Sequence, residues 1–125
     1  MSTILIVEDN AKNMKLVRDV LQHHGHATLE AETGEAGLKL ALQRRPDLVL
    51  MDIQLPDIDG ATVLARIRED ASLDAMPVLA VSASVMPDEQ QRIVRSGFDG
   101  FIAKPISIKP FLAAVQRALA QGRSK

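Results

Sequence analysis

The side chains best suited to chemistry in this sequence follow short apolar segments, and they are Glu8, Asp9, Asp52, Ser82 and Lys104. If the segments before Asp9 and Asp52 lie side by side, three carboxylates converge. Each pair about 5 Å apart would repel by about 3 kcal/mol at an effective dielectric constant of about 20. Such a cluster would attract a cation. Because its ligands would be oxygen atoms, with no Cys in the chain and no His nearby, Mg²⁺ is favoured.

The net charge of the carboxylates and Lys104 indicates which kind of ligand the site could bind once a cation is present. Three carboxylates and the Lys104 ammonium leave a net charge of −2, which one Mg²⁺ would neutralise. A phosphoryl group could then use the metal, Lys104 and the Ser82 hydroxyl as ligands for its oxygens. One carboxylate could act as the nucleophile and form an acyl phosphate. An alternative is that each acid is only a helix cap or a turn residue.

Alternation of short strands and longer helical periods predicts the elements that position these residues. We expect strands over residues 4–7, 26–31, 48–51, 78–81 and 101–102, and helices over residues 10–24, 33–44, 61–70, 87–97 and 107–119. Asn10, Thr33 and Ser107 are the expected N-caps of their helices. This order predicts an α/β fold with a doubly wound sheet of five parallel strands covered on both faces by five helices. Sites on such sheets lie at the carboxyl ends of the strands, where the reactive side chains are.

The composition narrows the class of protein. The chain has 125 residues, 15 Lys plus Arg, 16 Asp plus Glu and three Phe as its only aromatic residues, so no surface for direct nucleic-acid binding is expected. The absence of Cys excludes thiol catalysis and agrees with a reducing compartment. No apolar run approaches the about 20 residues of a membrane-spanning helix, and the N-terminus lacks a secretory signal. We expect one cytoplasmic domain over residues 1–125. The initiating Met and the short polar tail from Gln121 to Lys125 favour a complete chain over one excised from a hybrid kinase.

The residues around the candidate site resemble the receiver domain of bacterial two-component response regulators, in particular the stand-alone DivK-like type and receivers fused to hybrid kinases. The resemblance spans nearly the whole chain and is carried by residues 7–10, 47–56, 59–60, 82–83 and 104–105. It implies a flavodoxin-like strand order of 2-1-3-4-5 with no DNA-binding output domain. The protein would be a phosphoprotein that takes up a phosphoryl group but is not a turnover enzyme.

The resemblance also implies a role for each residue of the site. Asp52 would be the phosphoacceptor. Glu8, Asp9 and Asp52 would hold Mg²⁺ together with the backbone carbonyl of Gln54, Ser82 and Lys104 would contact the phosphoryl group, and Pro105 would follow a cis peptide bond. The side chains of Gln54 and Ser84 would lie at the edge of the pocket and tune the lifetime of the phosphate.

A phosphoryl group would become a signal through a switch at Ser82 and Phe101. By resemblance, Ser82 moves toward the phosphate and Phe101 swings into the vacated space, which alters the surface of the fourth helix, fifth strand and fifth helix. An ordinary core role for Phe101 is the alternative. The donor would be the phosphohistidine of a sensor histidine kinase or a histidine phosphotransfer protein, and the receiver of the signal a downstream effector protein.

Three other functions compete with this hypothesis. A phosphohydrolase with an Asp nucleophile usually carries a second acid two residues later, where this chain has Gln54. A nucleotide binder on the same sheet would need a first loop rich in Gly, Ser or Thr, whereas Glu8 and Asp9 would repel phosphate. A pseudo-receiver that only docks proteins would not need every residue of the pocket.

Other conspicuous residues have simpler explanations. His23, His24 and His26 lack the spacing of a closed zinc site and are expected to be solvent-facing. The cations on the first helix, Lys12, Lys15 and Arg18, could dock the phosphodonor protein, and a solvated face explains them equally well. Asp57 and Asp59 are expected to shape the loop that contains them.

Overall fold

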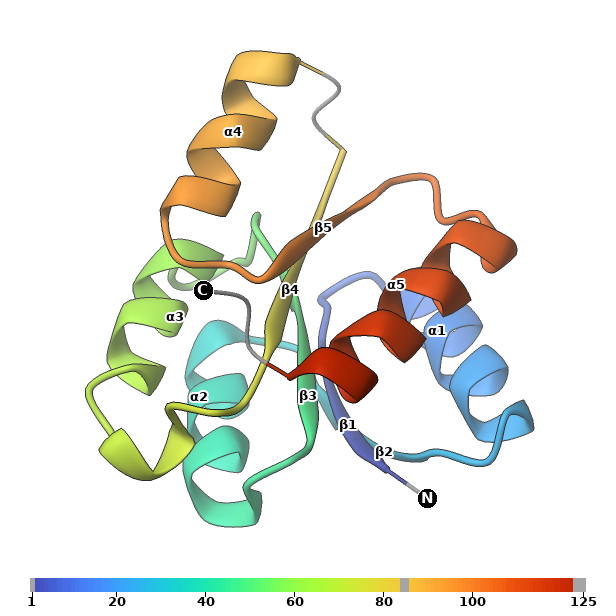
Figure 1. Ribbon diagram of the computed structural model, residues 1–125, viewed down its shortest axis with the longest axis horizontal. Helices are drawn as coiled ribbons and strands as arrows, with labels where there is room; N and C mark the ends of the chain where they lie inside the picture. The colour runs from blue at the N-terminus through green and yellow to red at the C-terminus, as the bar shows by residue number, and fades with distance from the viewer. Residues whose placement is uncertain (1, 84–85, 123–125) are drawn as a thin grey trace.

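Five parallel strands form the centre of the computed structural model, which describes residues 2–83 and 86–122 (Figure 1). The sheet has the order β2-β1-β3-β4-β5, as the resemblance implied. Its strands are β1 (Thr3–Val7), β2 (Ala27–Ala31), β3 (Leu48–Asp52), β4 (Val78–Ser82) and β5 (Gly100–Ala103). The predicted doubly wound α/β fold is confirmed.

Helices cover both faces of the sheet. They are α1 (Ala11–His23), α2 (Gly34–Arg44), α3 (Gly60–Ile67), α4 (Pro87–Arg95) and α5 (Ile108–Gln121). In Figure 1, α1 and α5 lie on one side of the sheet and α2, α3 and α4 on the other. Each side has its own apolar core, one centred on Phe111 and Leu21 and the other on Leu64 and Ile67. Burial of the alternate side chains of β1 and β3 in both cores explains why residues 4–7 and 48–51 are all apolar.

Side-chain caps begin three of the helices. The oxygens of Asn10 and Thr33 accept hydrogen bonds from the amides of Asn13 (3.0 Å) and Ala36 (3.1 Å), at the helix starts that the sequence predicted. Asp59 caps α3 through the amide of Thr62 (2.8 Å), so this helix begins one residue earlier than expected. At α5, residue 107 occupies the N-cap position without a side-chain cap hydrogen bond.

The segment after α3 differs from the prediction. The helix ends at Ile67 instead of continuing to about residue 70, and a short 3₁₀ helix, η1 (Ala71–Leu73), follows. Arg68 donates to the carbonyl of Leu73 (2.9 Å) and to the carboxylate of Asp99 (3.2 Å). These contacts join the end of α3 to η1 and to the residue before β5, and a helical pattern in the sequence does not predict them.

Candidate functional site

Strand register places the site residues side by side at the carboxyl edge of the sheet. Val7 of β1 pairs with Met51 of β3, so Glu8 and Asp52 follow on adjacent strands. Asp52 pairs with Val81 of β4, next to Ser82. Ser82 in turn pairs with Ala103 of β5, which precedes Lys104. Residues far apart in the sequence thus converge because parallel strands end at one edge.

The ammonium of Lys104 lies between two buried carboxylates. Its Nζ is 3.0 Å from Oδ2 of Asp52 and 3.1 Å from Oε1 of Glu8, and both carboxylate side chains are 5% exposed. Backbone amides hold the other oxygens, since Gln54 donates to Oδ1 of Asp52 (2.9 Å) and Asn10 donates to Oε2 of Glu8 (3.1 Å). Both carboxylates are therefore fixed in orientation. The peptide bond between Lys104 and Pro105 is cis.

Burial and charge shift the protonation of this group of residues. Burial raises the pKa of Glu8 from its ordinary value of 4.5 to about 6, and a hydrogen bond with Asp52 acts in the same direction, against the lowering by the Asn10 amide and Lys104. Burial alone would lower the pKa of Lys104, but its hydrogen bonds to Asp52 and Glu8 outweigh that effect and raise it. Lys104 is therefore a firmly charged cation at neutral pH.

The three acids form a set of oxygen ligands suited to a hard divalent cation. Glu8, Asp9 and Asp52 each offer a carboxylate oxygen, and these oxygens lie within 4.8 Å of one another. Glu8 and Asp52 are buried, whereas Asp9 is exposed, so the cluster opens to solvent on one side. With Lys104 included, the net charge is −2, and carboxylates with some retained water are the environment that Mg²⁺ takes in proteins.

The other predicted residues that the structure describes are Ser82, Gln54 and Phe101. Ser82 is the last residue of β4 and is 7% exposed. Gln54 lies in the exposed loop after β3, and Ser84 lies outside the described residues. Phe101 is partly buried on β5, where it packs against the core and also lines a groove with Gln90 and Val94 of α4. It therefore has contacts on both the core side and the surface side.

The acids of the loop after β3 shape the backbone, as the sequence predicted. Asp59 caps α3, and Asp57 accepts hydrogen bonds from the amides of Gly34 (2.8 Å) and Glu35 (2.9 Å) at the start of α2. The amides of Glu35 and Gly34 hold the pKa of Asp57 below its ordinary range. The contact of Asp57 with α2 was not predicted, although Asp is a preferred capping residue, because its partners are 22 and 23 residues away.

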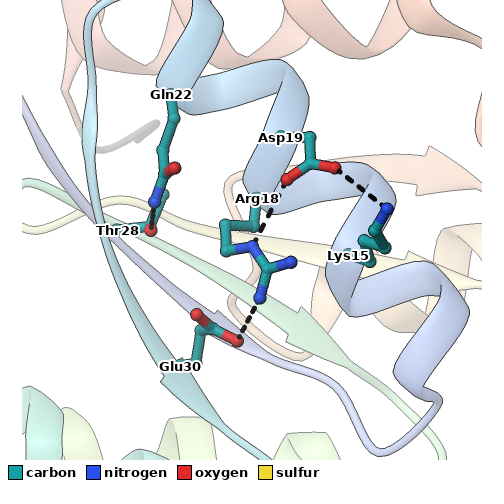
Figure 2. Close-up of polar contacts among 6 residues, drawn as sticks. All are labelled: Lys15, Arg18, Asp19, Gln22, Thr28 and Glu30. Carbon is teal, nitrogen blue, oxygen red and sulfur yellow. Dashed lines mark hydrogen bonds and ion pairs between the residues drawn. The ribbon is translucent and has the colours of Figure 1, made fainter.

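Two of the cations of α1, Lys15 and Arg18, make contacts within the chain (Figure 2). Arg18 lies 3.4 Å from the carboxylates of both Asp19 and Glu30, and Lys15 lies 3.8 Å from Asp19. Arg18 therefore connects α1 to β2. A solvated, internally paired face accounts for these two cations.

The three histidines do not assemble a metal site. The rings of His23 and His24 meet edge to face at 5.4 Å, and His24 is hydrogen-bonded to the carbonyl of Val20. Within residues 2–83 and 86–122, the only group of three metal-ligating side chains is the acidic one.

None of the helices in the described part of the chain has the length and apolar character that a membrane span requires.

Known proteins are similar to this chain in both sequence and fold. The family model of the response regulator receiver domain matches residues 4–116. The polar-differentiation response regulator DivK of Brucella anthropi is 41% identical over 117 residues, which cover 94% of this chain and 95% of the relative.

Solved structures of response regulators have the same fold as this chain. The structure of the Vibrio cholerae chemotaxis protein CheY4 is 25% identical in sequence and has a TM-score of 0.87, and the match covers 94% of this chain and 98% of that one. The receiver domain of the sensor histidine kinase PA1611 from Pseudomonas aeruginosa, described with a magnesium ion coordinated in its active site cleft, is 26% identical. Its TM-score is 0.88, and the match covers 95% of this chain and 98% of that one.

Proposed function

Because this chain belongs to the response regulator receiver domain family, which acts in two-component signalling, we propose that it accepts a phosphoryl group on Asp52 from a phosphohistidine. A carboxylate oxygen of Asp52 attacks the phosphorus. The new P–O bond forms as the P–N bond to the imidazole breaks, and the electron pair stays on the imidazole nitrogen, which binds a proton. The product is an acyl phosphate.

The bridging position of Lys104 is the observation that carries this proposal. The Lys104 ammonium lies 3.0 Å from Asp52 and 3.1 Å from Glu8. It can therefore contact an oxygen of a phosphoryl group bound to Asp52 without a large movement. Ser82, at the end of the neighbouring strand, supplies a hydroxyl for another phosphoryl oxygen. Such prepositioned donors are the main requirement of phosphoryl transfer.

The acidic residues fit a divalent cation, for which we propose Mg²⁺. The carboxylates of Glu8, Asp9 and Asp52 would hold it, with the backbone carbonyl of Gln54 as a further ligand. When bound, the ion neutralises the excess charge of −2 and polarises the phosphoryl oxygens. Glu8 and Asp52 are already oriented by the amides of Asn10 and Gln54 (3.1 and 2.9 Å), so little reorganisation accompanies its binding.

The phosphate is proposed to act through protein contacts. Receiver domains interact with kinases and effectors in general, and here we propose a sensor histidine kinase or histidine phosphotransfer protein as the donor. Attraction of Ser82 to the phosphate would change the packing of Phe101, which contacts both the core and the groove beside α4. The effector would bind the face made by α4, β5 and α5. The protein would act in the cytoplasm as one domain and carry the phosphoryl group without turning over a substrate.

Intact-mass measurement after incubation with a small acyl phosphate tests the proposal. The wild type should gain one phosphoryl group in the presence of Mg²⁺ and none with a chelator, and Asp52→Asn should gain none. Asp19→Asn is the matched control, because Asp19 is an exposed aspartate on α1 and should leave the gain unchanged. A phosphoryl group on Asp52→Asn, or labelling that does not need the metal, would exclude Asp52 as the Mg²⁺-dependent acceptor.

A further inference from the structure

The loop between β3 and α3, residues 53–59, is held against the start of α2 by one side chain. The two carboxylate oxygens of Asp57 accept separate hydrogen bonds from the first two amides of α2, those of Gly34 (2.8 Å) and Glu35 (2.9 Å). These amides have no partner within their own helix, and the helix dipole favours a negative charge beside them. Both carboxylate oxygens of Asp57 are therefore bound to the positive end of α2.

The packing next to Asp57 reinforces this contact. A Cβ atom at Gly34 would lie 2.5 Å from Cγ1 of Ile58 and 2.9 Å from Cγ2 of Val63, so only glycine allows the loop to come this close to α2. The base of the same loop is closed separately. The amide of Ile53 donates to Val81 (3.1 Å), and the amide of Gly60 donates to Ile53 (3.1 Å).

Gln54 lies in this loop between its base and Asp57. Its amide orients Oδ1 of Asp52 at 2.9 Å, and its carbonyl is the proposed backbone ligand of the metal. The position of Gln54 relative to the carboxylates depends on how firmly the loop is held at both ends. Besides the base, the hydrogen bond of Gln54 to Asp52 and the packing of Leu55 against the core hold this segment, and Asp57 supplies its attachment to α2.

We propose that Asp57 is a positioning residue for the metal and phosphoryl site, because its attachment to α2 fixes the loop that carries Gln54. The inference rests on the proposed function. Asp57 itself touches neither the metal nor the phosphate. Its contribution is to order the loop in advance, so that binding of the cation does not have to order it.

Titration with Mg²⁺, followed by NMR of the backbone amides, tests the inference. Asp57→Ala should bind Mg²⁺ about tenfold more weakly than the wild type, at the lower end of the effect of removing an outer-shell partner. Asp57→Asn should fall between them, since its amide keeps one acceptor oxygen. Asp70→Ala is the matched control, because Asp70 is a partly exposed aspartate that accepts hydrogen bonds from the amide (2.9 Å) and hydroxyl (2.6 Å) of Ser72 at η1. The Mg²⁺ affinity of this variant should equal that of the wild type.

A second measurement separates positioning from a merely structural role. With Asp57→Ala, the rate of phosphoryl uptake should approach the wild-type rate at saturating Mg²⁺, because Asp52, Ser82 and Lys104 are intact. A purely structural role would lower stability in both the Asp57 and the Asp70 variant and leave the Mg²⁺ affinity at the wild-type value, which would overturn the inference. If the wild type itself bound no Mg²⁺ or took up no phosphate, the proposed function would fail instead.

Discussion

Replacing Lys104 with Met removes the ammonium that lies between Glu8 and Asp52 and leaves an apolar side chain of similar length. The two carboxylates then face each other with oxygens no more than 4.8 Å apart. At an effective dielectric constant of about 20, this corresponds to a repulsion of about 3 kcal/mol. The loss of one partner from a buried ion pair typically costs about 3–5 kcal/mol, so we expect the metal-free variant to lose about 3 kcal/mol of stability at pH 8.

The loss should depend on pH because Glu8 can take up a proton. Its pKa is about 6 in the folded protein against an ordinary value of 4.5. A raised carboxyl pKa contributes stability that is fully present below 4.5 and lost as the pH rises through 6, and this shift amounts to about 2 kcal/mol. Lys104 lowers the pKa of Glu8, so the pKa should rise further in Lys104→Met. The deficit of the variant should therefore be smaller at pH 5 than at pH 8.

Urea denaturation followed by far-ultraviolet circular dichroism measures this effect, because the chain has no Trp or Tyr. Scans in chelator at pH 5 and pH 8 should show the deficit growing with pH, and Mg²⁺ should restore part of it by replacing the lost positive charge. Lys15→Met is the control, since its side chain is 71% exposed and its ion pair with Asp19 spans 3.8 Å. Wild-type stability of Lys104→Met at pH 8, or a deficit equal at both pH values, would refute the reasoning.

Three further substitutions test contacts between elements of the fold, each by urea denaturation. Gly60→Ala should cost about 1–3 kcal/mol, as overpacking usually does, because the new Cβ would lie 2.7 Å from the backbone oxygen of Asp52; unchanged stability would contradict this close approach. Asp99→Ala should cost about 3 kcal/mol or more, because it removes the buried carboxylate 3.2 Å from the Arg68 guanidinium, and a cost below about 1 kcal/mol would show that this pair behaves like a surface pair. Arg18→Ala should cost less than about 1 kcal/mol, since its salt bridges lie at the surface, and a larger loss would mean that its link between α1 and β2 is structural.

Local signals in the sequence determined most of the architecture. Alternating apolar periods identified every strand and α-helix within a few residues, because each element must bury its own apolar face. Asn10 and Thr33 could be assigned as caps because a capping side chain bonds to an amide three residues away. The site was also predictable, since chemical side chains at the ends of parallel strands share one edge of the sheet.

Tertiary structure alone decided the contacts between distant segments. The attachment of Asp57 to α2 and the pairing of Arg68 with Asp99 each join residues more than 20 positions apart. The end of α3 and the formation of η1 also depend on tertiary structure. Arg68, the residue after α3, is held by hydrogen bonds to Leu73 and Asp99. The bridging of Glu8 and Asp52 by Lys104 likewise required four strands, β1, β3, β4 and β5, to be in register. A local sequence pattern indicates which face of a helix or strand is buried. The distances between distant side chains depend instead on how the buried faces of different elements pack together.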